Sequence, residues 1–263
     1  SQNLSNIVWA YATAKEQHPL LFQKVANAVI TKQNEFNSQS MTNFLWACTT
    51  NGQIDQNLFK SLAPTAAALV GKSNSQELAS LAWAFAVADV AAPSLFDDIF
   101  INACLEKQDE FNTVNLSQLH QWNLWQEEMN SNVRLPQSLQ KKCFEAFLPA
   151  VPRPSSAFHA DVIKKLSSIV PQPEEEVLTK RGYCLDAQVE VNGNKIGIVI
   201  DDPSHFLARE ATGSTILKHR QAANLEEIPV VFVSYLEWKP FGKGNLNKKQ
   251  QYLRALLGLK REG

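Results

Sequence analysis

Three segments repeat one pattern in the first half of the chain: SQNLSNIVWA at 1–10, SQSMTNFLWA at 38–47 and SQELASLAWA at 75–84. Their tryptophans stand at positions 9, 46 and 83, so the period is 37 residues. A second mark has the same period, because Leu-Phe pairs begin at positions 21, 58 and 95. Two independent marks with one period indicate a true internal repeat.

Each repeat is expected to form two helices. In the first helix, Leu4, Val8 and Tyr11 recur at helical spacing. Breaking residues between the two helices support the division: Pro19, Gly52 and Pro93. A single pair cannot bury its apolar surface, so the pairs are expected to stack into an α-helical solenoid. We predict repeats at 1–37, 38–74 and 75–112, and a degenerate fourth repeat at 113–150, in which the match slips by one residue at Leu116 and by two at Trp122.

The repeated polar positions of the first helices are the candidates for ligand contact. Amide and hydroxyl side chains there can read the edges of RNA bases if they line an open face; an ordinary solvated stripe is the alternative. The positions are Gln2, Gln39 and Gln76, then Asn6, Asn43 and Ser80. The neighbouring tryptophans Trp9, Trp46 and Trp83 could be stacking platforms for bases, but a tryptophan beside alanine on a mostly apolar helix is usually buried, so they are expected in the core. Cys48 and Cys104 are expected in the core as well.

Composition limits the class of protein. Hydrophobic residues make up 44% and charged residues 19%, which excludes a mainly disordered chain. No run of about 18 uncharged apolar residues is present, so no membrane partner is expected. The four cysteines form no CxxC pair, which favours reduced, mostly buried thiols over a zinc ribbon or a disulfide framework. Ser1 stands at a repeat boundary, so a fragment or a processed form is one expectation.

Charge is distributed unevenly along the chain. Residues 1–150 carry 9 Lys and Arg against 13 Asp and Glu, a balance of −4, whereas residues 151–263 carry 16 against 13, a balance of +3. A local basic face in the second part would suit phosphate groups. The candidate contacts are Lys218, His219 and Arg220. A solvated helix would give the same count.

A cluster of proline and serine at 149–156 predicts a boundary between domains at 1–150 and 151–263. Beyond it, the apolar patterns predict a small α/β domain. We expect helices at 157–168, 214–224 and 247–257, a connector at 171–176, and strands at 185–191, 196–201 and 229–235, with the second strand central.

The second part resembles a RAP domain over roughly residues 155–260. The resemblance depends on three motifs: GYCLD at 182–186, IDDPSHF at 200–206 and YLEW at 235–238. At Asp202 the family more often has glycine. The 37-residue units are similar to heptatricopeptide (octotricopeptide-like) repeats, which often precede RAP domains in organelle-directed proteins. The Fas-activated serine/threonine kinase family has a similar layout.

The resemblance implies work on RNA in an organelle: stabilising, processing or translating transcripts, or holding ribosomal RNA as part of an organellar ribosome. The implied partners are single-stranded or ribosomal RNA, with ribosomal proteins or other RNA-processing factors. The implied location is the mitochondrion, with the plastid as the alternative. In the loop of the second motif, Asp202 and His205 join the candidate RNA-binding residues.

RAP domains are similar to the PD-(D/E)XK nuclease fold, so a metal-dependent RNA endonuclease is the alternative function. That site needs an acid on one strand and an acid-x-Lys triplet on the next, which together hold a divalent metal. Asp186 fits the first acid, but the triplet is Val199-Ile200-Asp201, so the motif is incomplete. Only as a nuclease would Asp186 and Asp201 be catalytic and Mg²⁺ be a cofactor. As an RNA-binding protein, the chain needs no catalytic residue, metal or cofactor.

A protein-binding scaffold is the third class of function, because helical solenoids often bind peptides. The acidic balance of residues 1–150 favours it. The dependence of binding on salt separates the classes, since phosphate contacts make affinity fall strongly with salt.

Overall fold

The computed structural model describes residues 1–149, 156–242 and 245–260. It divides into two compact units, Ser1–Phe147 with Glu210–Leu217, and Leu148–Arg209 with Lys218–Gly263. The first unit is mainly helical, and the second contains a small mixed sheet. Helical repeats followed by an α/β region were the coarse expectation from the sequence. The boundary predicted at 150/151 lies outside the described residues.

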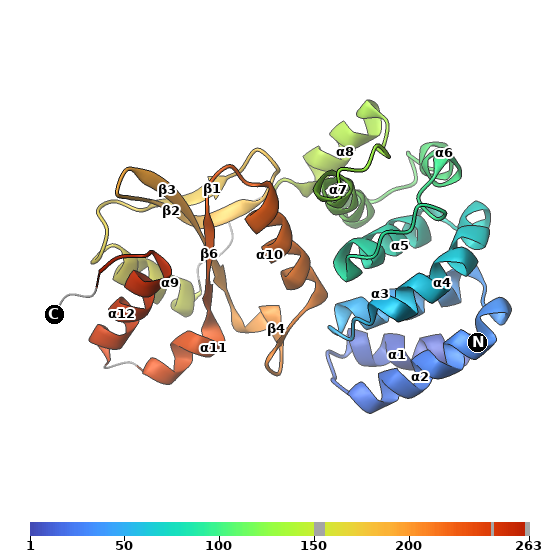
Figure 1. Cartoon of the computed structure of the whole chain (residues 1–263), viewed down its shortest axis with the longest axis horizontal. Helices are drawn as coiled ribbons and strands as arrows, with labels where there is room; N and C mark the ends of the chain where they lie inside the picture. The colour runs from blue at the N-terminus through green and yellow to red at the C-terminus, as the bar shows by residue number, and fades with distance from the viewer. Residues whose placement is uncertain (150–155, 243–244, 261–263) are drawn as a thin grey trace. The chain divides into compact units, whose positions relative to one another are not determined.

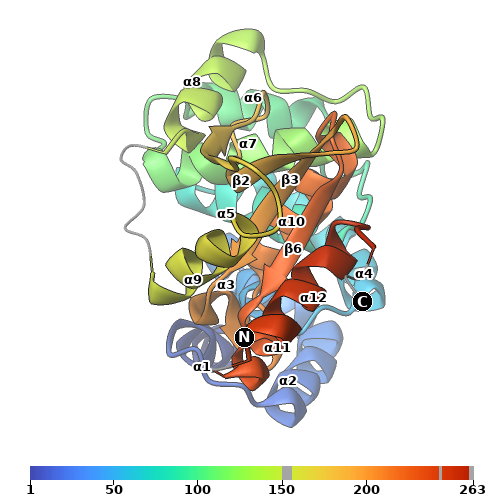
Figure 2. The same ribbon diagram turned by 90° about the vertical axis from the view of Figure 1, so that its left-hand side faces the viewer.

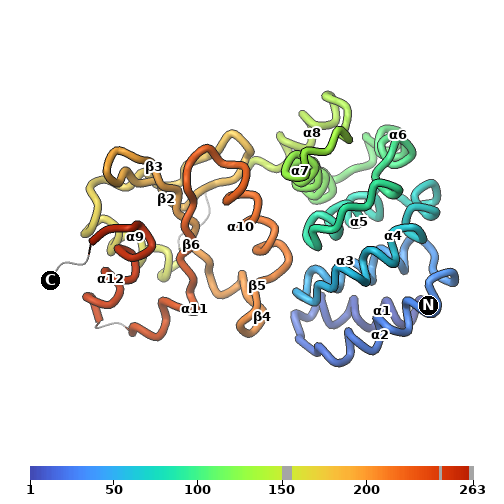
Figure 3. The backbone as a smooth tube through the Cα atoms, viewed as in Figure 1, coloured from blue at the N-terminus to red at the C-terminus, as the bar shows by residue number. Residues whose placement is uncertain are grey.

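The helices of the first unit come in pairs, which Figures 1 and 3 show as successive layers along the chain. The first helices of the pairs are α1 (Gln2–Thr13), α3 (Ser38–Thr50), α5 (Ser75–Ala88) and α7 (Thr113–Glu128). The second helices are α2 (Pro19–Lys32), α4 (Gln56–Leu69), α6 (Asp98–Glu106) and α8 (Gln137–Phe147). Short 3₁₀ turns, η1 (Gln33–Glu35) and η2 (Val70–Lys72), follow α2 and α4.

An asparagine begins each of three first helices. The side chains of Asn37, Asn74 and Asn112 accept a hydrogen bond from the backbone N–H three residues on, which satisfies a donor that the helix leaves unpaired. These caps are 37 and then 38 residues apart. The fourth repeat is therefore one residue out of phase, and Gln121, not Trp122, occupies the position of Trp83.

The first helices pack side by side, α1 on α3, α3 on α5 and α5 on α7, and each second helix packs beside them. Aromatic rings connect the layers edge to face. Between ring centroids, Phe59 lies 5.2 Å from Phe85, and Phe96 lies 5.6 Å from Phe85 and 5.1 Å from Phe100. Trp122 continues the series at 5.2 Å from Phe100. One core therefore runs through successive repeats, and Cys48 and Cys104 lie in it as expected.

The third repeat departs from the sequence expectation. Leu95 and Phe96 match the Leu-Phe pairs of the other repeats, yet they lie in the loop before α6. The helix begins at Asp98 because the carboxylate of Asp97 accepts hydrogen bonds from the next free backbone N–H groups. Both Leu95 and Phe96 are still buried, so the apolar mark predicts the core here and not the helix start.

The sheet of the second unit has the order β1-β2-β3-β6. Its strands are β1 (Glu174–Leu178), β2 (Cys184–Val191), β3 (Asn194–Asp201) and β6 (Val230–Ser234). Strands β1, β2 and β3 are antiparallel, and β3 is parallel to β6, with Asp201 opposite Ser234. A separate two-stranded sheet comprises β4 (Phe206–Leu207) and β5 (Glu210–Ala211). β3 is internal as expected, whereas β6 is an edge strand.

Helices cover both faces of this sheet. Helices α9 (Ala157–Leu166) and α12 (Leu246–Leu256) share one core with β2, β3 and β6. On the other face lies α10 (Gly213–Leu225), whose His219 ring stacks on Phe232 of β6 at 3.9 Å. Figures 1 and 2 show α9 and α12 together and α10 across the sheet from them. The turn η3 (Pro203–His205) follows β3, and α11 (Tyr235–Trp238) and η4 (Lys239–Phe241) follow β6.

Candidate functional site

The first helices have one open side. In α3, residues packed toward the neighbouring helices and toward α4 are buried, including Ser40, Phe44 and Thr49. The positions i, i+4, i+7 and i+11 fall on the remaining side of a helix. In α3 they are Gln39, Asn43, Trp46 and Thr50; Gln39 is exposed and the other three are half-buried, with the hydroxyl of Thr50 itself buried. We call this row, with its equivalents Gln2, Asn6, Trp9 and Thr13 in α1, the open strip.

The polar residues singled out from the repeats lie on this side, with one exception. Gln2, Asn6, Gln39 and Gln76 are exposed, and Asn43 is half-buried. Ser80 departs from the expectation, because it is buried and its Oγ lies 3.5 Å from Oε1 of Gln118 in α7. The structure therefore brings accessible amides together on α1 and α3, and closes the row at α5.

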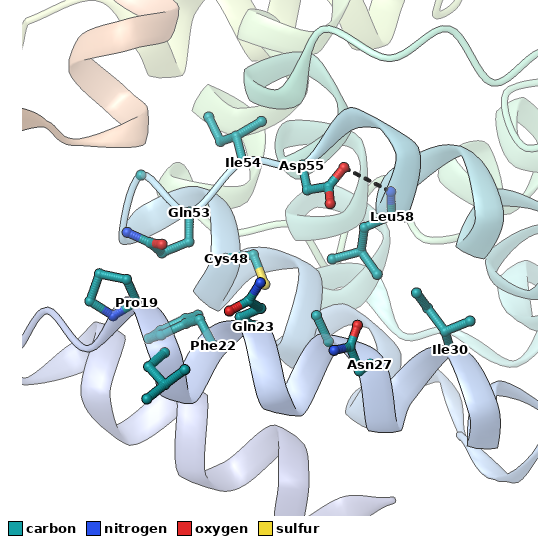
Figure 4. Close-up of a pocket in the computed structure, with 13 residues that line it drawn as sticks. Pro19, Phe22, Gln23, Asn27, Ile30, Cys48, Gln53, Ile54, Asp55 and Leu58 are labelled. Carbon is teal, nitrogen blue, oxygen red and sulfur yellow. Dashed lines mark hydrogen bonds between the residues drawn. The ribbon is translucent and has the colours of Figure 1, made fainter.

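A hollow of about 520 Å³ lies on the other side of the helical unit (Figure 4). It is lined by α2 residues such as Phe22, Gln23 and Asn27 and by the loop that leads into α4. The Asp55 carboxylate in this loop accepts hydrogen bonds from the backbone N–H groups of Asn57 and Leu58, so it serves as the cap of α4. None of the residues proposed for RNA contact lines this hollow.

A cluster of aspartates and histidines lies at the carboxyl end of β3 in the second unit. Asp201 is the last residue of β3, His205 ends the following turn and His219 comes from α10. The end of parallel strands is where α/β sheets usually bind ligands. Proximity in sequence brings Asp201 and His205 together, whereas only the fold brings His219 to them.

Asp201 is 1% exposed and contacts an imidazole on each of its two oxygens. Nδ1 of His205 lies 3.0 Å from Oδ1, and Nε2 of His219 lies 2.8 Å from Oδ2. An ionised carboxylate only accepts hydrogen bonds, so Nδ1 of His205 carries the proton in its hydrogen bond to Oδ1. The aspartate therefore selects the tautomer of His205, whereas Nε2 of His219 meets Oδ2 in a close ionic contact.

The charge of Asp201 is held by its two partners. Burial alone raises the pKa of Asp201, but hydrogen bonding to His205 and His219 and the charge of both imidazoles outweigh it, and the pKa lies below its usual value. The carboxylate thus stays ionised although it is buried. The cluster holds one buried negative charge beneath two imidazole rings whose side chains are about one-quarter exposed.

Asp186, the other acid of the nuclease alternative, is also engaged. The pairing between β2 and β3 stops at Ala187 and Ile198, and beyond it Oδ2 of Asp186 accepts the backbone N–H of Ile200 at 2.7 Å. Its Oδ1 lies 3.5 Å from Nε2 of His159 on α9. Asp186 thereby replaces a missing ladder hydrogen bond and also contacts an imidazole.

A hydrogen bond of Asp202 connects the loop after β3 to the start of α9. Its Oδ1 accepts the hydroxyl of Ser156 at 2.7 Å, and Ser156 Oγ in turn caps the N–H of His159. Asp202 has φ −60°, a conformation open to any residue, so the turn has no need of the glycine that RAP domains often have here. Lys218 and Arg220, next to His219 on α10, are half-buried.

The acids and imidazoles of this cluster are engaged with one another. Val199, at the position where a nuclease has its second acid, is buried, and Asp201 is enclosed by imidazoles. Within residues 1–149, 156–242 and 245–260, no group of three or more His, Cys, Asp or Glu side chains is arranged to hold a metal ion.

The third motif of the RAP resemblance, YLEW, forms a second polar cluster on the opposite face of the sheet. Asp161 accepts the indole N–H of Trp238 at 2.9 Å and the ammonium of Lys249 at 2.7 Å. Burial raises the pKa of Asp161, but its bonds to Lys249 and Trp238 lower it below the usual value. These hydrogen bonds connect α9 with α11 and α12.

Sequence reasoning missed several of these partners. The contacts of His159 with Asp186, of Ser156 with Asp202 and of Asp161 with Trp238 were not predicted from the sequence. No local pattern pairs residues that are 27 to 88 positions apart. The helix starts, in contrast, have a signal in the sequence: an asparagine directly precedes three of the repeated helices, at Asn37, Asn74 and Asn112.

No model of a known protein family matches this chain, and no curated protein matches it. Among the residues that the structure describes, no helix is both long and apolar enough to span a membrane.

Proposed function

We propose that this protein binds single-stranded RNA in an organelle, through the open strip of a helical solenoid and the loop after β3 of a RAP-like domain related to the PD-(D/E)XK nucleases. The observation that carries the proposal is the row of accessible amides, Gln2 and Asn6 on α1 and Gln39 and Asn43 on α3, at equivalent positions of adjacent helices. A carboxamide donates and accepts hydrogen bonds, so it can pair with a base edge.

The modular geometry suits this ligand. Helical-repeat proteins that read RNA use two or three side chains of each repeat for one base. Here each open repeat offers two amides and one tryptophan. Lys218 and Arg220 on α10 would supply contacts to phosphate, and His205 and His219 would each offer the ring nitrogen that does not face Asp201 as a hydrogen-bonding group. Work on transcripts or on ribosomal RNA in the mitochondrion, with the plastid as the alternative, belongs to this proposal.

Binding of a labelled single-stranded RNA pool tests the function. We expect Gln39→Ala with Asn43→Ala to weaken binding about tenfold, because a neutral hydrogen bond contributes about 0.5–1.5 kcal/mol. The matched control is Gln23→Ala with Asn27→Ala, which removes the same pair of amides at the same spacing from α2 on the other layer.

The outcomes separate the three classes of function. Salt-sensitive binding that only the α3 variant weakens supports the proposal. Wild-type protein that binds no RNA at low salt contradicts it and favours a protein-binding scaffold. Shortened RNA in the presence of Mg²⁺, lost in Asp201→Ala, would favour the endonuclease instead.

A further inference from the structure

The three repeated tryptophans hold one position in their helices but differ in accessibility. Trp9 is 43% exposed, Trp46 is half-buried, and Trp83 is 6% exposed. Repeat arrays usually place a repeated aromatic residue in the core, and the sequence led to that expectation. The expectation of a core position is correct for Trp83 and wrong for Trp9.

The difference comes from the residue that occupies the tryptophan position in the next repeat. Trp83 donates its indole N–H to Oε1 of Gln121 at 3.0 Å, and Gln121 occupies the tryptophan position of α7. Gln118, one turn before it, lies against Ser80. Two glutamines of α7 therefore close the row of polar and aromatic side chains at the third repeat.

The first two repeats have no such closure. The residue that corresponds to Gln121 is Trp46 for Trp9, and Trp83 for Trp46. An indole only donates hydrogen bonds, so neither neighbour can accept an indole N–H. In the part of the chain that the structure describes, the indole N–H groups of Trp9 and Trp46 have no acceptor. No ring contact joins these three tryptophans there either.

We infer that Trp9 and Trp46 are stacking platforms for two successive bases of a single RNA strand, and that Gln118 and Gln121 end the platform at the third repeat. The inference rests on the proposed function and specifies where on the strip the bases lie. Each indole lies on the same helix face as two amides, Gln2 with Asn6 and Gln39 with Asn43. A base stacked on the ring would place its polar edge within reach of these groups.

The spacing of the helices selects a single strand. Adjacent packed helices lie about 8–10 Å apart, whereas stacked bases along a strand are about 3.4 Å apart. Two bases held by Trp9 and Trp46 must therefore separate from each other, which a duplex does not allow. A peptide could satisfy the indole N–H groups, but it offers a flat ring only where it has an aromatic side chain, whereas every base of an RNA strand has one.

The test measures binding of a labelled single-stranded RNA decamer to full-length variants. Stacking on one aromatic ring is worth about 1–3 kcal/mol, so Trp9→Leu and Trp46→Leu should each weaken binding about 5- to 150-fold. Trp9→Phe and Trp46→Phe keep a ring and should stay within about threefold of wild type. Leu20→Ala, which removes a 55% exposed apolar side chain from α2, is the control for unspecific loss.

The possible results distinguish this inference from the function on which it rests. If wild-type protein binds no RNA, the proposed function fails. If wild-type protein binds and both leucine variants, with unchanged thermal midpoints, bind equally well, only the platform fails. Equal affinity for duplex RNA also overturns it. Gln121→Ala releases Trp83, and a gain in affinity for the decamer would support Gln121 as the end of the platform, whereas a loss would contradict that role.

Discussion

At the scale of single residues, Asp201 shows how a buried charge becomes compatible with a fold. Its carboxylate is 1% exposed, and each oxygen faces an imidazole. Removing one partner of such a group leaves the others buried without compensation, which costs more than the net value of the contact. Because these contacts need an ionised Asp201, the free energy of unfolding of the second unit should depend on pH.

Asp201→Asn should lower the free energy of unfolding by about 1–3 kcal/mol at pH 6. Because the folded pKa lies below the usual value, this contribution is present above the ordinary aspartate pKa of about 3.9 and is lost as the pH falls through the folded pKa. Urea unfolding at several pH values measures it. Glu190→Gln, on the exposed side of β2, is the control. A deficit that persists unchanged at pH 3 would contradict the explanation.

The four thiols should differ in reactivity. Burial raises the pKa of Cys48, with help from Asp55, and burial also raises the pKa of Cys104, with a smaller effect of Cys143. Burial raises the pKa of Cys143 to about 12. Cys184 is only half-buried. We expect a thiol-specific reagent to modify one cysteine quickly in the native protein and all four after denaturation; fast modification of two or more would show that the first unit opens.

How far the sequence predicts a site depends on how far apart its residues lie in the chain. Asp201, Asp202 and His205 share one motif, so their proximity was predictable. His219 was singled out for its basic neighbours, and its contact with Asp201 comes only from the packing of α10 on β6. Ser80 was grouped with Asn6 and Asn43 by repetition, but Gln118, from a degenerate repeat, covers it.

At the scale of elements, the repeated helices are defined by how they start. Asn74 and Asn112 form reciprocal caps, because the side chains of Glu77 and Asn115 return a hydrogen bond to the cap backbone. The α1 helix starts at Ser1 without a side-chain cap. In the three later repeats, the start of the first helix therefore coincides with an asparagine cap.

Asn74→Ala and Asn112→Ala should each lower stability by about 1 kcal/mol, the usual value of a helix cap. Asn57→Ala, an exposed asparagine inside α4, should change it by less than about 0.5 kcal/mol. Thermal unfolding followed by circular dichroism compares the three. Equal losses at all three positions would mean that the caps have no special role.

The elements that sequence reasoning missed are short or charged. Strand β1 contains Glu174, Glu175 and Glu176, all exposed, and such an edge strand has no alternating apolar pattern to reveal it. Helix α11 is a single turn, capped by Ser234 through the N–H of Leu236. In contrast, β2, β3, α9, α10 and α12 lie where the apolar patterns predicted them, because each has a face to bury.

At the scale of the whole molecule, the proposed function divides the RNA contacts between the two parts of the chain by charge. Residues 1–150 have a net charge of −4 and the open strip has no basic residue, so its contribution to binding RNA should not depend on salt. The phosphate contacts are assigned to Lys218 and Arg220 in the second unit.

Two phosphate contacts predict a shallow dependence of affinity on salt. For single strands the slope of log K against log salt is about −0.7 for each contact, so a slope of about −1.4 is expected. Lys218→Ala with Arg220→Ala should bring the slope close to zero, whereas Trp9→Leu should lower affinity and leave the slope unchanged. A wild-type slope of about −4 or steeper would mean that phosphate contacts dominate.

The asparagine before each repeated helix also bears on how such a chain can evolve. Because Asn37, Asn74 and Asn112 belong to the segment just ahead of the helices that they start, a stretch of 37 residues carries its own start signal. Copying that stretch within a gene would add a helix pair that starts at its own cap, without substitutions in the adjacent repeats. In the fourth repeat, Asn112 caps the helix although glutamine stands at the tryptophan position, so the start signal does not depend on the residue at that position.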